Sequence, residues 1–332
     1  MYLLVTQSFG KESEYRRAVF AVLSFWARYS GDKKVVKTVI FTDNSTFFQQ
    51  YLSDIDVHYV HLTPEKMKSM RGRIDFLHRM KIALIEETFL LYPEATILYI
   101  DSDTFFIEDA TLWMKSFTPG KSFMHLLEYP FESCREAPLP AGQTQRAFLN
   151  LIESKTFITS QGVESYTAQQ ASWNAGVMGL PYQVASWLPD VYSLTDEFYP
   201  PSKSHGSEQS AFSLILQTRT QLEPCDQYVY HYWHRVQKEI IDSLLPTYLN
   251  KQFQSRNIEK KLYDIKKYST SLPILFATHH LAIKDHAIQS FNEKKYKLGY
   301  YYSFKLLCQF SIDMAFLKDL LYHSKQFFAQ SK

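Results

Sequence analysis

The hydrophobic and polar positions of the first hundred residues follow two periods in turn. Short runs rich in β-branched and aromatic residues, typical of buried strands, alternate with stretches whose apolar residues recur at helical spacing. The predicted strands span residues 2–6, 35–41, 57–62 and 96–100, and the predicted helices span residues 12–29 and 73–91. This alternation is typical of a doubly wound parallel sheet with helices on both faces.

Beyond residue 117 the pattern becomes less regular. Residues 118–171 carry four prolines and are interpreted as a variable segment on the acceptor side, with a helix within residues 143–154. Regular elements resume with a helix that Ser207 is expected to cap and with a strand over residues 221–233. In the tail, apolar residues recur at helical spacing over residues 300–328, which predicts one or two further helices.

Two aspartates, Asp101 and Asp103, follow the predicted strand at residues 96–100. In an extended backbone alternate side chains share a face, so we expect the two carboxylates to project together. Hard oxygen ligands at the carboxyl end of a buried strand suit Mn²⁺ or Mg²⁺. A second Asp-x-Asp triplet at residues 54–56 precedes its strand and would lie at the wrong end. Asp101 and Asp103 are therefore the candidate metal or phosphate site.

Three later stretches carry candidate chemistry, each with a structural alternative. Asn174 precedes the small residues Ala175 and Gly176, a pattern that lets the backbone pass close to a ligand or simply turn into a strand. Glu208 lies in the first turn of a helix, where an acid usually complements the helix dipole. His231, at a strand end with His234 and Lys238 beyond it, is a candidate metal ligand.

Composition and charge limit the class of protein. A chain of 332 residues with 45% hydrophobic residues is long enough for one large α/β domain or two smaller ones. The net charge of +2 hides an asymmetry, because residues 251–332 hold 14 Lys/Arg against 6 Asp/Glu, whereas residues 1–250 hold 22 against 28. We therefore predict a catalytic domain at residues 1–250 and a basic helical extension at residues 251–332. The acidic body and the lack of a known binding module argue against a nucleic-acid partner.

Several sequence signals are missing. The three cysteines are far apart and odd in number, so no disulfide framework is expected, which favours a reducing compartment. The chain shows neither a signal peptide nor an apolar run long enough to cross a bilayer, and we expect a cytoplasmic protein. The Gly-x-Gly-x-x-Gly and Walker lysine loops of dinucleotide and nucleoside-triphosphate sites are also missing.

Four stretches together resemble the GT-A nucleotide-sugar glycosyltransferases, and within them family 8, the glycogenin and lipopolysaccharide galactosyltransferase type. They are His-Arg-Met-Lys at 78–81, Leu-Tyr-Ile-Asp-Ser-Asp at 98–103, Trp-Asn-Ala-Gly-Val-Met at 173–178 and Ser-Glu-Gln-Ser-Ala at 207–211. Their order and approximate spacing agree over residues 1–240. The resemblance implies a GT-A fold, a mixed sheet flanked by helices. It also implies metal-dependent transfer of a sugar from a nucleotide diphosphate sugar, a UDP-sugar above all, to a glycan or lipid-linked acceptor.

The resemblance also implies roles for individual residues. The metal ligands would be Asp101, Asp103 and His231, although the usual His-x-x-Gly-x-x-Lys is missing and His234, His279 and His280 are rivals for the third position. The family's Asp-Gln pair appears here as Glu208-Gln209. The donor would lie beside Thr6, Asp43, Arg79, Lys81, Asp101, Ala175, Gly176 and Lys238, and the reacting centre beside Asn174, Glu208 and Gln209.

Two alternative functions are carried forward. A nucleotidyltransferase would need a glycine-rich basic loop after the first strand, and residues 7–11 replace it poorly. A catalytically inert sugar-nucleotide-binding protein would keep the fold, but retention of both aspartates argues against it. The basic tail has two interpretations: it packs on the catalytic domain or on a second subunit, or it holds the enzyme on the inner face of an anionic membrane.

Overall fold

In the computed structural model the chain forms two compact units, and the structure describes residues 1–137, 141–310 and 314–330. The sheet unit contains residues 1–231 and 251–266, and the helical unit contains residues 232–250 and those from 267 onward. Residues 232–250 therefore group with the C-terminal helices, and residues 251–266 group with the sheet. The two units do not follow the predicted boundary at residue 250, and the division into functional domains at 1–250 and 251–332 stays a prediction.

A seven-stranded sheet forms the centre of the sheet unit. Its strand order is β12 (Gln221–Pro224), β6 (Lys121–Met124), β11 (Val177–Leu180), β4 (Thr96–Ile100), β1 (Tyr2–Gln7), β2 (Val36–Thr42) and β3 (Val57–His61). The strands β4, β1, β2 and β3 are parallel, as the sequence pattern predicts. In contrast, β11 runs antiparallel to both of its neighbours, and β12 is parallel to β6.

The sheet is therefore mixed, which confirms the expected fold class and corrects the all-parallel interpretation of the sequence pattern. The sequence pattern did not reveal this because β11 has only four residues. A short apolar run does not indicate whether the strand runs parallel or antiparallel to its neighbours. The antiparallel pairing places the start of β11 beside the end of β4, because Val177 pairs with Ile100. Residues 174–176 and Asp101 consequently meet at one edge of the sheet.

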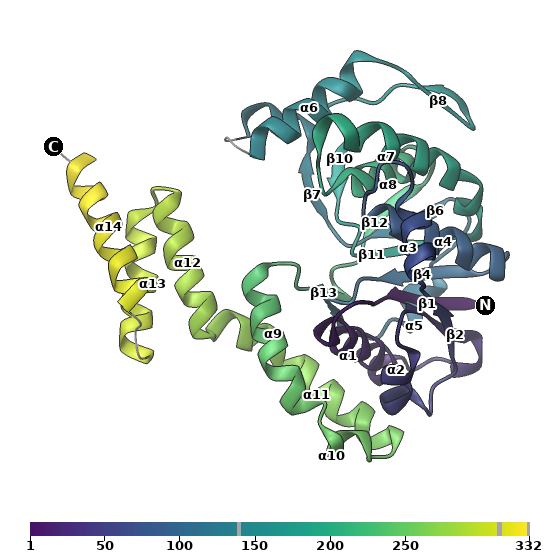
Figure 1. Cartoon of the computed structure of the whole chain (residues 1–332), viewed down its shortest axis with the longest axis horizontal. Helices are drawn as coiled ribbons and strands as arrows, with labels where there is room; N and C mark the ends of the chain where they lie inside the picture. Colours follow the sequence, from purple (N-terminus) through teal and green to yellow (C-terminus); the bar gives the residue numbers. More distant parts are fainter. Residues whose placement is uncertain (138–140, 311–313, 331–332) are drawn as a thin grey trace. The chain divides into compact units, whose positions relative to one another are not determined.

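Helices cover both faces of the sheet (Figure 1). One face packs on α4 (Arg79–Leu91), α7 (Leu188–Ser202) and α8 (Ser207–Arg219) in a single apolar core. The other face packs on α1 (Glu12–Arg28), whose Trp26 Nε1 donates a hydrogen bond to Thr38 Oγ1 of β2. The period-2 alternation of the strands explains this, since Leu3 and Val5 belong to the first core whereas Leu4, also fully buried, points to the opposite face.

The remaining elements of the sheet unit are short. They comprise α2 (Ser45–Leu52), α3 (Pro64–Arg71), β5 (Thr104–Phe106), α5 (Thr111–Lys115), β7 (Leu127–Pro130), α6 (Ala141–Ser154), β8 (Phe157–Thr159), β9 (Gly162–Glu164), β10 (Ala171–Trp173), β13 (Val229–His231), α10 (Lys251–Gln254) and three 3-10 turns at Lys33–Val35, Phe131–Glu136 and Tyr182–Trp187. The helix expected within residues 143–154 is confirmed as α6. The strand expected at residues 221–233 is divided into β12 and β13.

The expected cap of α8 is wrong. Gly206 occupies the N-cap position, and Ser207 is the first helical residue. The Ser207 hydroxyl instead donates to the Ser204 carbonyl at 2.8 Å, a local bond that serine can form in place of capping.

The helical unit contains α9 (Arg235–Tyr248), α12 (His280–Asn292), α13 (Tyr296–Gln309), α14 (Met314–Gln330) and the second part of α11 (Ile258–Thr278). Gly299 lets α13 pack closely on α12, because a Cβ atom there would lie 2.5 Å from the Phe291 ring. Among the described residues, no helix is long and apolar enough to cross a membrane.

A buried ion cluster joins three elements of the sheet unit. Arg219, at the end of α8, donates to Glu164 of β9 at 2.9 Å and to Asp190 of α7 at 2.6 Å, and all three side chains are largely buried. Removing one partner from such a cluster leaves charges without compensation in a medium that solvates them poorly.

We therefore predict that Arg219→Met lowers the free energy of unfolding by about 3 kcal/mol. The matched control is Arg135→Met, which removes an ion pair with Glu153 at the surface and should cost less than about 1 kcal/mol. Urea denaturation of both variants measures the difference. Equal losses would contradict the buried role of Arg219.

Candidate functional site

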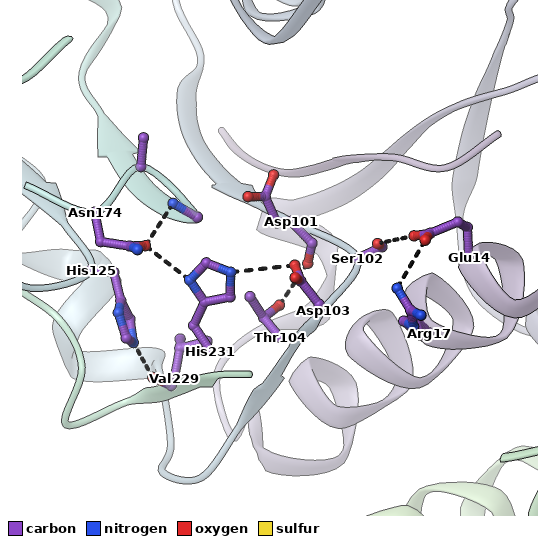
Figure 2. Close-up of polar contacts among 12 residues, drawn as sticks. Glu14, Arg17, Asp101, Ser102, Asp103, Thr104, His125, Asn174, Val229 and His231 are labelled. Atoms are coloured by element: carbon purple, nitrogen blue, oxygen red, sulfur yellow. Dashed lines mark hydrogen bonds and ion pairs between the residues drawn. The ribbon is translucent and has the colours of Figure 1, made fainter. Parts of the chain in front are cut away.

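Three ligand-type side chains converge at the edge of the sheet where β4 ends (Figure 2). Asp101 and Asp103 follow β4, and His231 ends β13, which pairs with β5 so that His231 lies opposite Thr104. One ligand atom from each of the three side chains lies within 4.8 Å of the other two. The structure thus brings together both predicted aspartates and, of the four candidate histidines, His231.

The two aspartates lie on a turn, which corrects the expected extended geometry. The Asp101 N–H donates to the Gly176 carbonyl at 2.7 Å, and the Thr104 hydroxyl donates to the Asp101 carbonyl at 2.8 Å. Between the aspartates, the Ser102 hydroxyl donates to Glu14 of α1 at 2.9 Å (Figure 2). The turn directs the chain into β5, and with it Asp103 toward His231.

The orientation of His231 follows from its partner Asn174. The Asn174 amide nitrogen donates to Glu128 at 2.9 Å, and its Oδ1 accepts from the Gly176 N–H at 3.0 Å. Oδ1 is therefore an acceptor, and the Nδ1–H of His231 donates to it at 2.8 Å. In the neutral imidazole this leaves Nε2 as an acceptor, 3.3 Å from Asp103 Oδ1. Acceptors that face one another in this way require a cation or a proton between them.

Gly176 is needed because the His231 ring lies directly against it. A Cβ atom at residue 176 would lie 2.1 Å from Cε1 of His231, far closer than van der Waals contact. The sequence pattern predicted a backbone that passes close to a ligand, and in the structure the neighbour is the imidazole ring. Residue 176 therefore controls the position of His231.

Lys81 of α4 compensates part of the negative charge. Its ammonium lies 3.0 Å from Glu208 Oε1, 3.3 Å from Asp101 Oδ2 and 3.0 Å from the Ala175 carbonyl. Burial acts to lower the pKa of Lys81, but the two carboxylates outweigh it and raise the pKa above its ordinary value. Lys81 is therefore charged, and it holds Glu208 in a buried ion pair.

The charge of the site remains negative. Asp101, Asp103 and Glu208 contribute three carboxylates, and Lys81 contributes one ammonium, so these four groups sum to −2 when ionised. Asp101 also accepts a hydrogen bond from the Tyr99 hydroxyl at 2.5 Å. A divalent cation would neutralise this negative charge, and carboxylate oxygens with an imidazole nitrogen are suitable ligands for such an ion.

Glu128 of β7 is a site residue that the sequence did not reveal. It accepts from Asn174 at 2.9 Å, from Gln209 at 2.7 Å and from the Ser172 hydroxyl at 3.3 Å. It thereby fixes the amide that orients His231. Glu128 falls in the irregular stretch at residues 118–171, where no periodicity or motif singled it out.

Gln209 holds the loop before β11 in place. Its Oε1 accepts from the Ala175 N–H at 3.1 Å, and its Nε2 donates to Ser172 Oγ at 3.0 Å as well as to Glu128. Gln209 and Asn174 are thus neighbours in one hydrogen-bond network. Their roles at the reacting centre, and that of Glu208, stay predictions.

Three other residues that were predicted to lie beside the donor have different surroundings. Arg79 makes a bidentate ion pair with Asp196, at 2.7 and 3.2 Å, and donates to the Met70 carbonyl at 3.1 Å, so its guanidinium joins α4 to α7. Thr6 is fully buried on β1. Lys238 lies on α9 in the helical unit. The donor-binding roles of these three residues stay predictions.

Asp43, another residue that was predicted to lie beside the donor, anchors the loop after β1. Its Oδ1 accepts from the Tyr15 hydroxyl at 2.7 Å, and its Oδ2 accepts from the Gly10 N–H at 3.0 Å. Burial, followed by the bond to Asp43, raises the pKa of Tyr15 to about 12.

We predict that Asp43→Asn lowers the pKa of Tyr15 from about 12 toward its usual value near 10, because the carboxylate that opposes ionisation is removed. Since the folded-state pKa is raised, the associated stability is complete below pH 10 and is lost as the pH rises through about 12. Absorbance titration at 295 nm, with Tyr15→Phe as the difference reference, measures the shift. An unchanged titration in the asparagine variant would contradict the contact.

Comparisons with known proteins give likenesses of fold. No protein-family model and no curated protein matches the chain. Mouse xyloside xylosyltransferase 1 is similar over 68% of this chain and 84% of its own, at 14% identity and a TM-score of 0.43. The galactosyltransferase LgtC, in complex with donor and acceptor sugar analogues, is similar over 74% of this chain and 95% of its own, at 12% identity and a TM-score of 0.44.

A putative glucose-1-phosphate thymidylyltransferase from Bacillus anthracis is also similar, over 79% of this chain and 99% of its own, at 10% identity and a TM-score of 0.40. Transferases of sugars and of nucleotides thus both occur among the similar structures.

Proposed function

We propose that this chain is a metal-dependent glycosyltransferase with a GT-A fold of the family 8 type. It would move a sugar from a nucleotide diphosphate sugar, a UDP-sugar by preference, to a glycan or lipid-linked acceptor in the cytoplasm. The observation that carries the proposal is the convergence of Asp101, Asp103 and His231 around a site with excess negative charge. Two carboxylates and an imidazole nitrogen held so close together form a suitable set of ligands for a divalent cation.

The set of metal-ligand atoms fits Mn²⁺ best and Mg²⁺ second. Both ions accept carboxylate oxygens, and an imidazole nitrogen favours the transition metal. Asp101, Asp103 and His231 would hold the ion, and Asn174 would act behind His231 as an outer partner that fixes the ring. When bound, a divalent cation supplies stabilisation of the charge that develops on the departing diphosphate.

The protein's own residues prepare this site before the donor arrives. Tyr99 and Lys81 fix the two oxygens of Asp101, and Glu128 fixes Asn174. Glu208 is held in an ion pair with Lys81, so in this arrangement it contributes a negative charge to the site and does not act as a base. Such preorganisation reduces the rearrangement needed as the sugar–phosphate bond breaks.

Incubation of the purified protein with Mn²⁺ and a panel of nucleotide sugars tests the proposal. We expect slow hydrolysis of one donor to free sugar and UDP, accelerated by the correct acceptor. Formation of pyrophosphate from a nucleoside triphosphate and a sugar 1-phosphate would show a nucleotidyltransferase instead. Tight, metal-dependent UDP binding without turnover of any donor would show an inert binding protein.

We predict that Asp103→Asn abolishes Mn²⁺-dependent UDP binding, because the neutral amide removes a charged ligand while it keeps the side-chain volume. The matched control is Asp54→Asn, in the exposed second Asp-x-Asp triplet, which should bind as the wild type does. Isothermal titration calorimetry measures both, and thermal unfolding checks that each variant folds. Unchanged binding in Asp103→Asn would remove the central ligand assignment.

A second variant tests the position of His231 without changing any ligand. Gly176→Ala should weaken Mn²⁺ binding by about 10- to 100-fold, the range typical of disturbed outer-shell contacts, because the added methyl group displaces the imidazole. Gly206→Ala is the control, since the nearest atom to its new Cβ would lie 3.7 Å away. If both alanine variants retain normal Mn²⁺ affinity, His231 is not a ligand.

A further inference from the structure

The last two helices present exposed apolar side chains. On α13, Tyr301, Phe304 and Leu307 are 59%, 68% and 46% exposed. On α14, Met314, Leu321 and Tyr322 are 69%, 63% and 59% exposed. Single exposed apolar residues are ordinary, but a repeated set on neighbouring helices indicates an interaction surface.

The inner face of α14 shows that this exposure does not result from loose packing. Phe316, His323, Ser324 and Phe327 follow one another at helical spacing. Phe316 is buried in a core with Ile283 and Leu306. His323 stacks on the Phe291 ring at a centroid distance of 5.1 Å, and the Tyr300 hydroxyl and Ser324 lie 3.0 Å apart. The helix is held on one side, and on the other side Met314, Leu321 and Tyr322 are exposed.

The outer face of each helix combines apolar residues with lysines. On α14, Met314, Lys318, Leu321, Tyr322 and Lys325 lie at i, i+4, i+7, i+8 and i+11, and all are exposed. On α13, Lys297, Tyr301, Phe304 and Cys308 lie at i, i+4, i+7 and i+11, and all are exposed. We call these two rows the outer stripes. Within residues 296–309 and 314–330 the single acidic residue is Asp319, which lies outside the stripe of α14.

We propose that the outer stripes of α13 and α14 attach the protein to the surface of an anionic lipid bilayer. Apolar and aromatic side chains would enter the interface, and lysines beside them would extend to the lipid phosphates, as in interfacial amphipathic helices. The two helices would lie on the membrane, since neither, as far as it is described, combines the length and the apolar character needed to cross it.

Charge favours a lipid surface over a second copy of this chain. A two-fold contact through the same stripe would bring Lys318 and Lys325 of one copy close to those of the other. With Asp319 as the one acid in these helices, that contact would be repulsive. An anionic bilayer instead complements the lysines.

Co-sedimentation of the full chain with vesicles tests the proposal without any sugar chemistry, so its failure is separate from failure of the proposed transferase activity. We expect binding to vesicles that contain phosphatidylglycerol at low salt, weaker binding at high salt, and little binding to pure phosphatidylcholine. Lys318→Gln with Lys325→Gln should weaken binding about 25-fold, about fivefold for each lysine. Phe304→Ser with Leu321→Ser should also release the protein.

The matched control is Lys68→Gln with Lys115→Gln, which removes the same charge from exposed positions of the sheet unit and should leave binding unchanged. Thermal unfolding checks that all variants fold. Equal loss in both lysine pairs would show attraction by net charge alone and would overturn the assignment. A wild-type protein that stays in the supernatant at low salt would also overturn the proposal. So would light scattering that shows a dimer of the wild type and a monomer of the variant with Phe304→Ser and Leu321→Ser.

Discussion

The buried ammonium of Lys81 is the interaction on which the site depends most. It lies between Asp101 and Glu208 and also donates to the Ala175 carbonyl, so it joins the end of β4, the start of α8 and the loop before β11. Without it, two carboxylates would lie near Asp103 at the edge of a hydrophobic core with no charge to compensate them. With it, one of the three negative charges is compensated, and a net formal charge of −2 is left for a cation.

The second constraint is steric and concerns His231. Glu128 fixes the Asn174 amide, Asn174 holds Nδ1 of the imidazole, and Gly176 leaves the space that the ring occupies. Each contact is ordinary, but the three contacts together determine which nitrogen of His231 faces Asp103. A side chain supported in this way can bind a ligand with little loss of conformational entropy.

The sequence predicted those features that depend on local pattern. The alternation of strands and helices and the place of Asp101 and Asp103 after a buried strand follow from hydrophobic periodicity, which a short stretch of chain already displays. The third metal ligand could not be assigned from the sequence, and His231 was one of four candidate histidines. His231 lies more than a hundred residues beyond Asp103, and no periodicity relates the two positions. Long-range contacts decided the rest. They include the antiparallel direction of β11, the hydrogen bonds of Glu128 and the ion pair of Arg79 with Asp196, a residue that no motif connects to it.

We infer that Asp101, Asp103 and His231 hold one divalent cation. Anomalous diffraction at the manganese edge, from crystals grown with Mn²⁺ and UDP, would locate this ion. We expect a single peak about 2.0–2.3 Å from a carboxylate oxygen of each aspartate and from Nε2 of His231. A peak bound by other residues, or ordered UDP in this region with no anomalous scatterer beside Asp103, would contradict it.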